Sequence, residues 1–241
     1  MLKFTLSLTL LSVAAFAGTP HAPDPTIVAV PGEGYYVFAT GRGLPIFHSE
    51  DLRSWREVDR VFDDPAPAWA VEAVPGASNI WAPDIVRVGD RYYCYYAVST
   101  FGSQRSVIGL AVNTVLDPDH PDYKWEDRGL VIDSDPARDD FNAIDSAFFQ
   151  DDDGTAYLFW GSYWTGIKVR RVDPATGKPD PAHHELHAVA SRVGHGNAIE
   201  APYVVKRGDY YYLFVSWGSC CDGADSTYKV MVGRAAHVLG P

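Results

Sequence analysis

The stretch Trp81-Ala82-Pro83-Asp84-Ile85 decides the fold class, because a related four-residue pattern returns along the 241-residue chain. An acid stands third in every copy, at positions 24, 84, 145 and 200. The copies are Ala22-Pro23-Asp24-Pro25, Ala82-Pro83-Asp84-Ile85, Ala143-Ile144-Asp145-Ser146 and Ala198-Ile199-Glu200-Ala201. A repeat of about 55 to 60 residues indicates one supersecondary unit used several times.

Each acid is followed by turn residues and then by an aromatic run that predicts a strand. The four runs begin at Tyr35-Tyr36-Val37-Phe38, Tyr92-Tyr93-Cys94-Tyr95-Tyr96, Tyr157-Leu158-Phe159-Trp160 and Tyr210-Tyr211-Tyr212-Leu213-Phe214. A strand, a tight turn and a second strand form a hairpin. Further β-like runs, such as 107–112 and 228–232, bring the count to about four strands per repeat, which predicts the blades of an all-β propeller.

Composition excludes several other classes. The 17 Pro and 21 Gly interrupt the chain too often for long helices, and no long stretch has helical apolar periodicity. A β-sandwich is the alternative fold, since sandwiches also place short strands between turns. With 20 basic and 31 acidic residues the net charge is −11. We therefore expect neither nucleic acid nor an anionic membrane as a partner.

The N-terminal segment 1–17 has the pattern of a signal peptide. A lysine precedes a mostly apolar stretch, and Ala15-Phe16-Ala17 supplies a small-x-small cleavage site. The 14 residues from Phe4 to Ala17 are too few to span a bilayer, which needs about 20. We expect a secreted, extracellular protein whose mature part, residues 18–241, is the propeller domain.

Three cysteines are too few for a disulfide framework, and no spacing matches a zinc site. Cys220 and Cys221 are adjacent, so a vicinal disulfide and two half-buried thiols are both open interpretations.

The repeated acids carry the functional prediction. The first strand of each propeller blade lines the central channel, so we expect the four acids to converge at one end of it. Crowded carboxyls repel one another and raise a pKa, which makes such a gathering typical of functional sites. Two carboxyls on opposite sides of a sugar are what glycoside hydrolysis needs.

The motifs together resemble glycoside hydrolase family 43. They are Asp24-Pro25-Thr26-Ile27, the WAPDI segment at 81–85, Asn142-Ala143-Ile144-Asp145 with the Asp-rich turn at 151–154, and IEAPYV at 199–204. The segment 161–164, Cys220-Cys221 and the run 226–234 are similar to the endo-1,5-α-L-arabinanases of that family. The resemblance runs from about His21 to the last residue, and it implies a five-bladed β-propeller.

The resemblance also implies an inverting mechanism with three catalytic acids. Asp24 matches the general base that activates water, and Glu200 matches the general acid. Asp145 matches the residue that holds substrate and whose charge keeps Glu200 protonated until it is needed. Inversion leaves room for a water, so we predict a separation of about 6.5 to 9.5 Å between the Asp24 and Glu200 carboxyls. Asp84 is interpreted as a structural acid that bonds backbone amides.

Five further residues are candidates for substrate contact. Aromatic rings stack on sugars, and small polar side chains bond sugar hydroxyls. Each candidate could equally serve ordinary packing. They are His21, Trp81, Phe101, Asn142 and Ser162.

The prediction for the whole protein is a monomeric enzyme that hydrolyses α-1,5-linked arabinan. An exo-acting arabinofuranosidase or a β-xylosidase on the same scaffold, and a non-catalytic carbohydrate-binding propeller, are the alternatives. No cofactor is required for the chemistry. A structural calcium ion is possible from the resemblance, with its ligand outside this chain. Four repeats in 241 residues also predict an unclosed propeller, with a fifth blade missing beyond Pro241.

Overall fold

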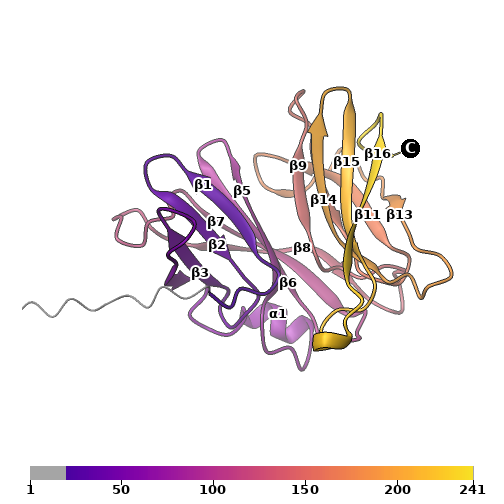
Figure 1. Ribbon diagram of the computed structural model, residues 1–241, viewed down its shortest axis with the longest axis horizontal. Coiled ribbons are helices and arrows are strands. Elements are labelled where there is room, and N and C mark those ends of the chain that lie inside the picture. Colours follow the sequence, from indigo (N-terminus) through magenta and orange to yellow (C-terminus); the bar gives the residue numbers. More distant parts are fainter. Residues whose placement is uncertain (1–19, 241) are drawn as a thin grey trace, which may run out of the picture.

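The computed structural model describes residues 20–240, and it shows four antiparallel sheets arranged as the blades of a β-propeller (Figure 1). The blades follow one another in chain order, from blade I near the N-terminus to blade IV near the C-terminus. The propeller prediction is therefore confirmed. The predicted signal peptide lies outside the described residues.

The strands of each blade are consecutive in sequence. Blade I contains β1 (Thr26–Val30), β2 (Gly34–Phe38), β3 (Pro45–Ser49) and β4 (Arg56–Arg60). Blade II contains β5 (Trp81–Val88), β6 (Arg91–Val98), β7 (Ser106–Asn113) and β8 (Glu126–Ser134). Blade III contains β9 (Ala147–Gln150), β10 (Ala156–Trp160), β11 (Ile167–Asp173), β12 (Lys178–Pro179) and β13 (His187–Ala190). Blade IV contains β14 (Ile199–Arg207), β15 (Tyr210–Trp217) and β16 (Lys229–Ala235).

The four aromatic runs form the second strands, β2, β6, β10 and β15, as predicted. A second strand is paired on both sides, so its rings reach both faces of the blade. Tyr93, Tyr95 and Tyr96 of β6 are fully buried, as are Phe159 and Trp160 of β10. These rings pack with buried aliphatic side chains in the hydrophobic clusters of the core.

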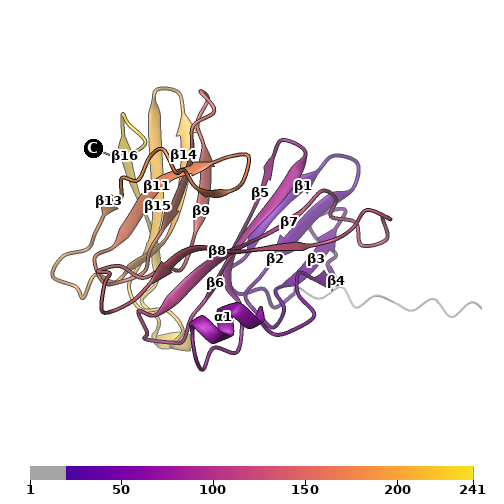
Figure 2. The same cartoon turned by 180° about the vertical axis from the view of Figure 1, so that it is seen from behind.

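One short helix, α1 (Ala68–Ala73), lies between β4 and β5, at the base of blades I and II (Figure 2). Trp69 of this helix donates its indole N–H to Asp127 Oδ2 at 2.8 Å. Six residues are too few to show a helical apolar period, so the sequence pattern does not predict this element. A 3₁₀ turn, η1 (Gly223–Asp225), lies between β15 and β16.

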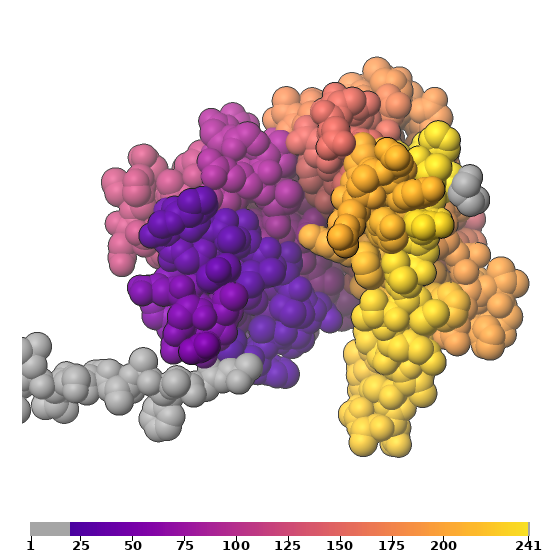
Figure 3. Space-filling view, turned by 45° about the horizontal axis from the view of Figure 1, so that its top comes forward, coloured from indigo at the N-terminus to yellow at the C-terminus, as the bar shows by residue number. Residues whose placement is uncertain are grey.

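Blade IV departs from the prediction of four strands per repeat. It has three strands in the described part of the chain, and no strand of it pairs with blade I among residues 20–240. Figure 3 shows the surface hollowed between the first blade, in indigo, and the last strands, in yellow. Several large apolar side chains of blade IV are exposed on one face of its sheet. They are Tyr203, Val205, Val230 and Val232.

Within residues 20–240, no helix has the length and apolar character needed to cross a bilayer.

Candidate active site

In every blade, a residue in the left-handed backbone conformation, which we call the kink residue, precedes or interrupts the first strand two positions before a pair with the second strand. The kink residues are Asp24, Ala82, Asp145 and Ala201, with φ of 46°, 40°, 57° and 52°. Two residues later, the strand pairs with the aromatic second strand in every blade. Those pairs are Thr26 with Phe38, Asp84 with Tyr95, Ala147 with Phe159 and Tyr203 with Phe214. The kink therefore fixes a common register for the four blades.

This register corrects the prediction that the four acids occupy equivalent positions. Asp24 and Asp145 are kink residues, but Glu200 comes one residue before its kink and Asp84 two residues after. The pairing of β5 is irregular between Trp81 and Asp84, and that of β14 between Glu200 and Tyr203. Such an irregularity shifts the register without a gap in the sequence, which the spacing of the acids cannot reveal.

Asp84 joins blade II to blade III. Its Oδ2 accepts the backbone N–H of Phe148 at 2.7 Å. Thr26 holds the same position in blade I, and its hydroxyl accepts the N–H of Ile85 in blade II at 3.2 Å. Burial raises the pKa of Asp84 to about 7, and the bond from Phe148 acts in the opposite direction. The contacts of Asp84 agree with the predicted structural role, although its bond crosses to the next blade.

Asp24 is exposed, and it is held by one hydroxyl group. Thr40 donates its Oγ1 hydrogen to Asp24 Oδ2 at 2.5 Å. Thr40 Oγ1 also accepts the backbone N–H of Ala82 at 2.8 Å. Thr40 is itself fixed by its N–H, which donates to Pro23 O at 2.9 Å. Asp24 Oδ2 is thus tied through Thr40 to the kink of the next blade, and within residues 20–240 no side chain or backbone group bonds Oδ1.

Asp145 lies close enough to the other two acids for their charges to act on it. Burial is the largest cause that raises the pKa of Asp145 well above its usual range, and the charges of Glu200 and Asp24 raise it further. The backbone N–H of Ala201, the kink residue of blade IV, acts in the opposite direction. Three blades therefore bring three acids together, and their mutual repulsion favours a site that keeps a proton.

Glu200 is buried and accepts two hydroxyl groups. Ser162 donates to Oε2 at 2.6 Å, and Tyr228 donates to Oε1 at 2.8 Å. The loop after β10, which carries Ser162, is also bonded to the strand that carries Glu200, because the N–H of Tyr163 donates to Ile199 O at 2.9 Å. Both carboxyl oxygens are therefore oriented by side chains from two different loops.

The five predicted contact residues differ in their surroundings. Trp81 holds in blade II the position that Glu200 holds in blade IV, directly before the kink. Ser162 bonds Glu200, and Asn142 is buried with its Oδ1 accepting the Ser106 hydroxyl at 2.7 Å. His21 and Phe101 are both exposed. Asn142 thus belongs to a buried hydroxyl network, while substrate contact by these five residues stays a prediction.

Sequence reasoning missed Thr40 and Tyr228 as partners of the acids. Thr40 is a single polar residue at no repeated spacing. Tyr228 lies in the run 226–234 that is similar to the endo-arabinanases, but nothing in that run singles it out as a partner of Glu200. The structure settles the state of the adjacent cysteines, because Cys220 and Cys221 form a disulfide.

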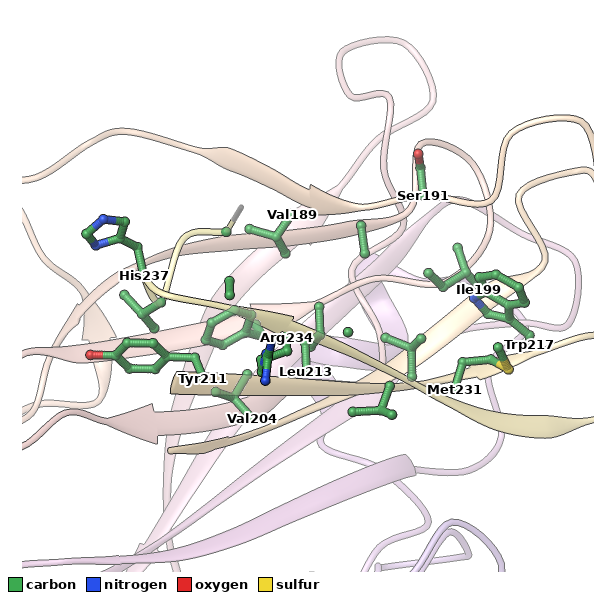
Figure 4. Close-up of a pocket in the computed structure, with 18 residues that line it drawn as sticks. Val189, Ser191, Ile199, Val204, Tyr211, Leu213, Trp217, Met231, Arg234 and His237 are labelled. Carbon is green, nitrogen blue, oxygen red and sulfur yellow. The ribbon is translucent and has the colours of Figure 1, made fainter. Parts of the chain in front are cut away.

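A mostly apolar cavity lies away from the three acids (Figure 4). It has a volume of about 460 Å³ and opens between β13 of blade III and the sheet of blade IV. Its lining includes Val189, Leu213, Trp217 and Met231, and none of the four repeated acids. Its lining is mostly apolar and includes none of the gathered carboxyls that glycoside hydrolysis requires, so the three acids mark the candidate site instead.

Among residues 20–240, no three acidic, histidine or cysteine side chains gather in a way that could hold a metal ion. The structural calcium ion that the family resemblance makes possible stays a prediction.

Comparison with known proteins decides the family. Residues 19–241 match the glycosyl hydrolases family 43. The chain belongs to this family. It is accordingly a glycoside hydrolase, in agreement with the three gathered carboxyls and with the resemblance of the motifs.

Individual relatives of this family 43 chain are named for both modes of arabinan cleavage. It is 42% identical to the extracellular exo-α-(1→5)-L-arabinofuranosidase ArbA of Cellvibrio japonicus, over 98% of this chain and 70% of that protein. It is 39% identical to the extracellular endo-α-(1→5)-L-arabinanase 1 of Bacillus subtilis, over 95% of this chain and 70% of that protein.

Solved structures agree with this assignment. An exo-1,5-α-L-arabinanase from a bovine ruminal metagenomic library is 42% identical and superposes with a TM-score of 0.86, over 94% of this chain and 74% of that one. The α-L-arabinanase of Cellvibrio cellulosa, solved with arabinohexaose, is 41% identical with a TM-score of 0.84, over 91% and 72%.

Proposed function

We propose that this family 43 enzyme is a secreted endo-acting arabinanase that cleaves α-1,5-linked L-arabinan with inversion at the anomeric carbon. The observation that supports the proposal is that the charges of Glu200, on blade IV, and Asp24, on blade I, both act on the buried Asp145 of blade III and raise its pKa in addition to the effect of burial. Relatives named for arabinan cleavage supply the substrate class.

Asp24 suits the role of general base. It is exposed, so water can reach it, and Thr40 bonds one of its two carboxyl oxygens. The other oxygen is free to accept a proton from a water molecule. A base placed on blade I stands apart from an acid on blade IV, as single displacement requires, and the predicted separation of about 6.5 to 9.5 Å stays part of this proposal.

Glu200 suits the role of general acid, since it is buried and its carboxyl is held by Ser162 and Tyr228. Asp145 stands beside it, and the charge of Glu200 adds to the burial that raises the pKa of Asp145. In the proposed reaction, Glu200 carries the proton that goes to the leaving group.

The proposed reaction balances with one water molecule. Glu200 gives its proton to the glycosidic oxygen as the bond from that oxygen to the anomeric carbon breaks. Asp24 takes a proton from the water, whose oxygen forms the new bond at the opposite face of the same carbon. Proton exchange with solvent then restores both carboxyls.

The experiment is turnover of debranched arabinan by Glu200→Gln. Loss of the general acid should lower kcat by about 10² to 10⁴. Glu185→Gln, which changes an exposed glutamate between β12 and β13, is the matched control and should retain activity. Near-wild-type turnover by Glu200→Gln would falsify the assignment. Arabinan binding by the wild type without release of reducing ends would indicate a non-catalytic carbohydrate-binding propeller.

An exo-acting enzyme is the second candidate, because a 42% identical relative is named as an exo-α-(1→5)-L-arabinofuranosidase. The early products separate the two modes. A ladder of oligosaccharides indicates cleavage within the chain, and a single short product from the outset indicates cleavage from an end.

Secretion rests on the N-terminal pattern and on relatives named as extracellular. N-terminal sequencing of protein recovered from the medium of its host should begin near Gly18. Recovery of Met1 there would contradict a cleaved signal peptide. We further propose that the enzyme acts as a monomer, which light scattering in solution tests.

A further inference from the structure

The loop between β15 and β16 delivers a tyrosine hydroxyl to the candidate acid. Tyr228, directly before β16, donates to Glu200 Oε1 at 2.8 Å. Ser162, from the loop after β10, donates to the other oxygen at 2.6 Å. The two donors come from different blades, so Tyr228 holds the carboxyl from the side that Ser162 does not reach.

The backbone around Tyr228 is fixed by a clamp across the two ends of this loop. The N–H of Ser219 donates to Thr227 Oγ1 at 3.1 Å, and the N–H of Thr227 donates to Ser219 O at 3.0 Å. Gly218 has a φ of 101°, and a Cβ there would come within 2.6 Å of Thr227 O. The loop ends can approach this closely only because residue 218 is glycine. Tyr228 follows the clamped Thr227 directly.

The rest of the loop is also braced. Asp222 donates its N–H to Ser226 Oγ at 3.0 Å, and the Cys220–Cys221 disulfide lies inside the clamped segment. Tyr163 of blade III donates its hydroxyl to Gly218 O at 3.4 Å, which ties the loop to the backbone beside Ser162. The hydrogen bonds and the disulfide of this loop therefore fix the position of the Tyr228 hydroxyl.

We propose that Tyr228 is a positioning residue for Glu200, which orients the carboxyl and stabilises its ionised form as the proton leaves. The inference rests on the proposed role of Glu200 as general acid. A hydrogen bond to a charged oxygen is stronger than one to a neutral oxygen, so the bond from Tyr228 strengthens while Glu200 becomes a carboxylate. An interaction that grows along the reaction raises kcat more than it lowers KM.

The hydroxyl keeps its own proton in this environment. Burial, followed by the charge of Glu200, raises the pKa of Tyr228 above the usual tyrosine range. Tyr228 therefore stays a donor across the pH range in which a carboxyl titrates.

The test is Tyr228→Phe, which removes the hydroxyl and keeps the ring. We expect kcat on debranched arabinan to fall about tenfold or more, with KM within about twofold, because a bond to a charged group is lost. The alkaline limb of the kcat/KM profile should move to higher pH, since loss of a donor disfavours the ionised carboxyl. A purely structural role for Tyr228 would not move that limb.

Tyr210→Phe is the matched control. Tyr210 and Tyr228 are each 41% exposed, and Tyr210 lies at the start of β15 with its ring under Arg234. The control should retain wild-type kcat and the wild-type alkaline limb. If Tyr228→Phe also retains both while the wild type cleaves arabinan, the positioning role is overturned and the proposed function stands.

A wild type that is inactive on arabinan would instead sink the proposed function, and the Tyr228 bond is then tested by NMR. Protein with ¹³C-labelled glutamate carboxyls shows the Glu200 resonance, which Glu200→Gln identifies by its absence. The titration curve of that resonance should move to higher pH in Tyr228→Phe and stay in place in Tyr210→Phe. Superimposable curves for the wild type and Tyr228→Phe would rule out the inference.

Discussion

Blades II and IV share nearly the same strand pattern, but equivalent apolar side chains on one face are buried in blade II and exposed in blade IV. Ile108 of β7 pairs with Ala97, and Val230 of β16 pairs with Ser216, at the same distance from the kink. Ile108 is wholly buried, whereas Val230 is 70% exposed. The difference comes from the neighbours, since blade II lies between two other blades and this face of blade IV is uncovered.

The next pair of positions repeats the contrast. Leu110 of blade II is wholly buried, and Val232 of blade IV is 56% exposed. The apolar alternation of a strand thus predicts that the strand forms, but the packing of the blades decides what the apolar side chain contributes to stability.

The largest expected effect comes from shortening the equivalent apolar side chains. Ile108→Ala should lower the free energy of unfolding by about 2 to 5 kcal/mol, because it leaves a cavity in a closed core. Val230→Ala should change it by less than about 0.5 kcal/mol. Urea denaturation of both variants measures the contrast. Equal losses would mean that the exposed face of β16 is covered in solution.

The next effect concerns Asp84 and the pH dependence of stability. Its pKa of about 7 in the folded protein lies above the usual value, so the folded state binds the proton more tightly than the unfolded chain does. This contribution to stability is present at low pH and is lost as the pH rises from about 4 to about 7. The loss is at most roughly 4 kcal/mol, since each pKa unit corresponds to about 1.4 kcal/mol.

Asp84→Asn removes this titration and keeps an oxygen to accept the N–H of Phe148. The fall in unfolding free energy between pH 5 and pH 8 should therefore be smaller in Asp84→Asn than in the wild type, as measured by urea denaturation at the two pH values. Asp90→Asn, at the exposed turn between β5 and β6, is the control and should follow the wild type. Asp84→Asn with the full wild-type fall would contradict a buried, titrating carboxyl at this position.

The smallest effect compares two third-strand glycines. A Cβ on Gly109 of β7 would lie 2.3 Å from Tyr96 Cζ, and the Tyr96 ring is fully buried with its hydroxyl bonded to Asp127. Gly109→Ala should therefore cost about 1 to 3 kcal/mol through overpacking. A Cβ on Gly233 of β16 meets nothing within 4 Å, so Gly233→Ala should be neutral or slightly stabilising. Thermal melting of the two variants checks the pair, and a reversed order would show that blade II can relax around Tyr96.

The sequence predicts the repeated elements of the fold well. The aromatic runs give the second strand of every blade, since each run lies between turn residues and alternates between two packed faces. It predicts the number of strands less well, because blade IV has three strands within residues 20–240 where four were expected. The helix α1 leaves no periodic signal at six residues.

For the candidate site, the sequence predicts that three of the acids gather, but it does not predict their exact register. Asp24, Asp145 and Glu200 do come together, but Asp84 and Glu200 are displaced from the kink in opposite directions. Strand pairing alone reveals that displacement. The hydroxyls of Thr40 and Tyr228 reach the acids through loop closure and packing between blades, which no local pattern encodes.

The left-handed kink places one residue of each blade at an equivalent backbone position. Holding a residue other than glycine in that conformation costs on the order of 1 to 2 kcal/mol, and the fold bears this cost in every blade. At this position Asp24 and Asp145 carry a carboxyl group, whereas Ala82 and Ala201 carry only a methyl group. A single substitution at Ala82 or Ala201 would therefore add a functional group at a kink position without a change in the course of the backbone.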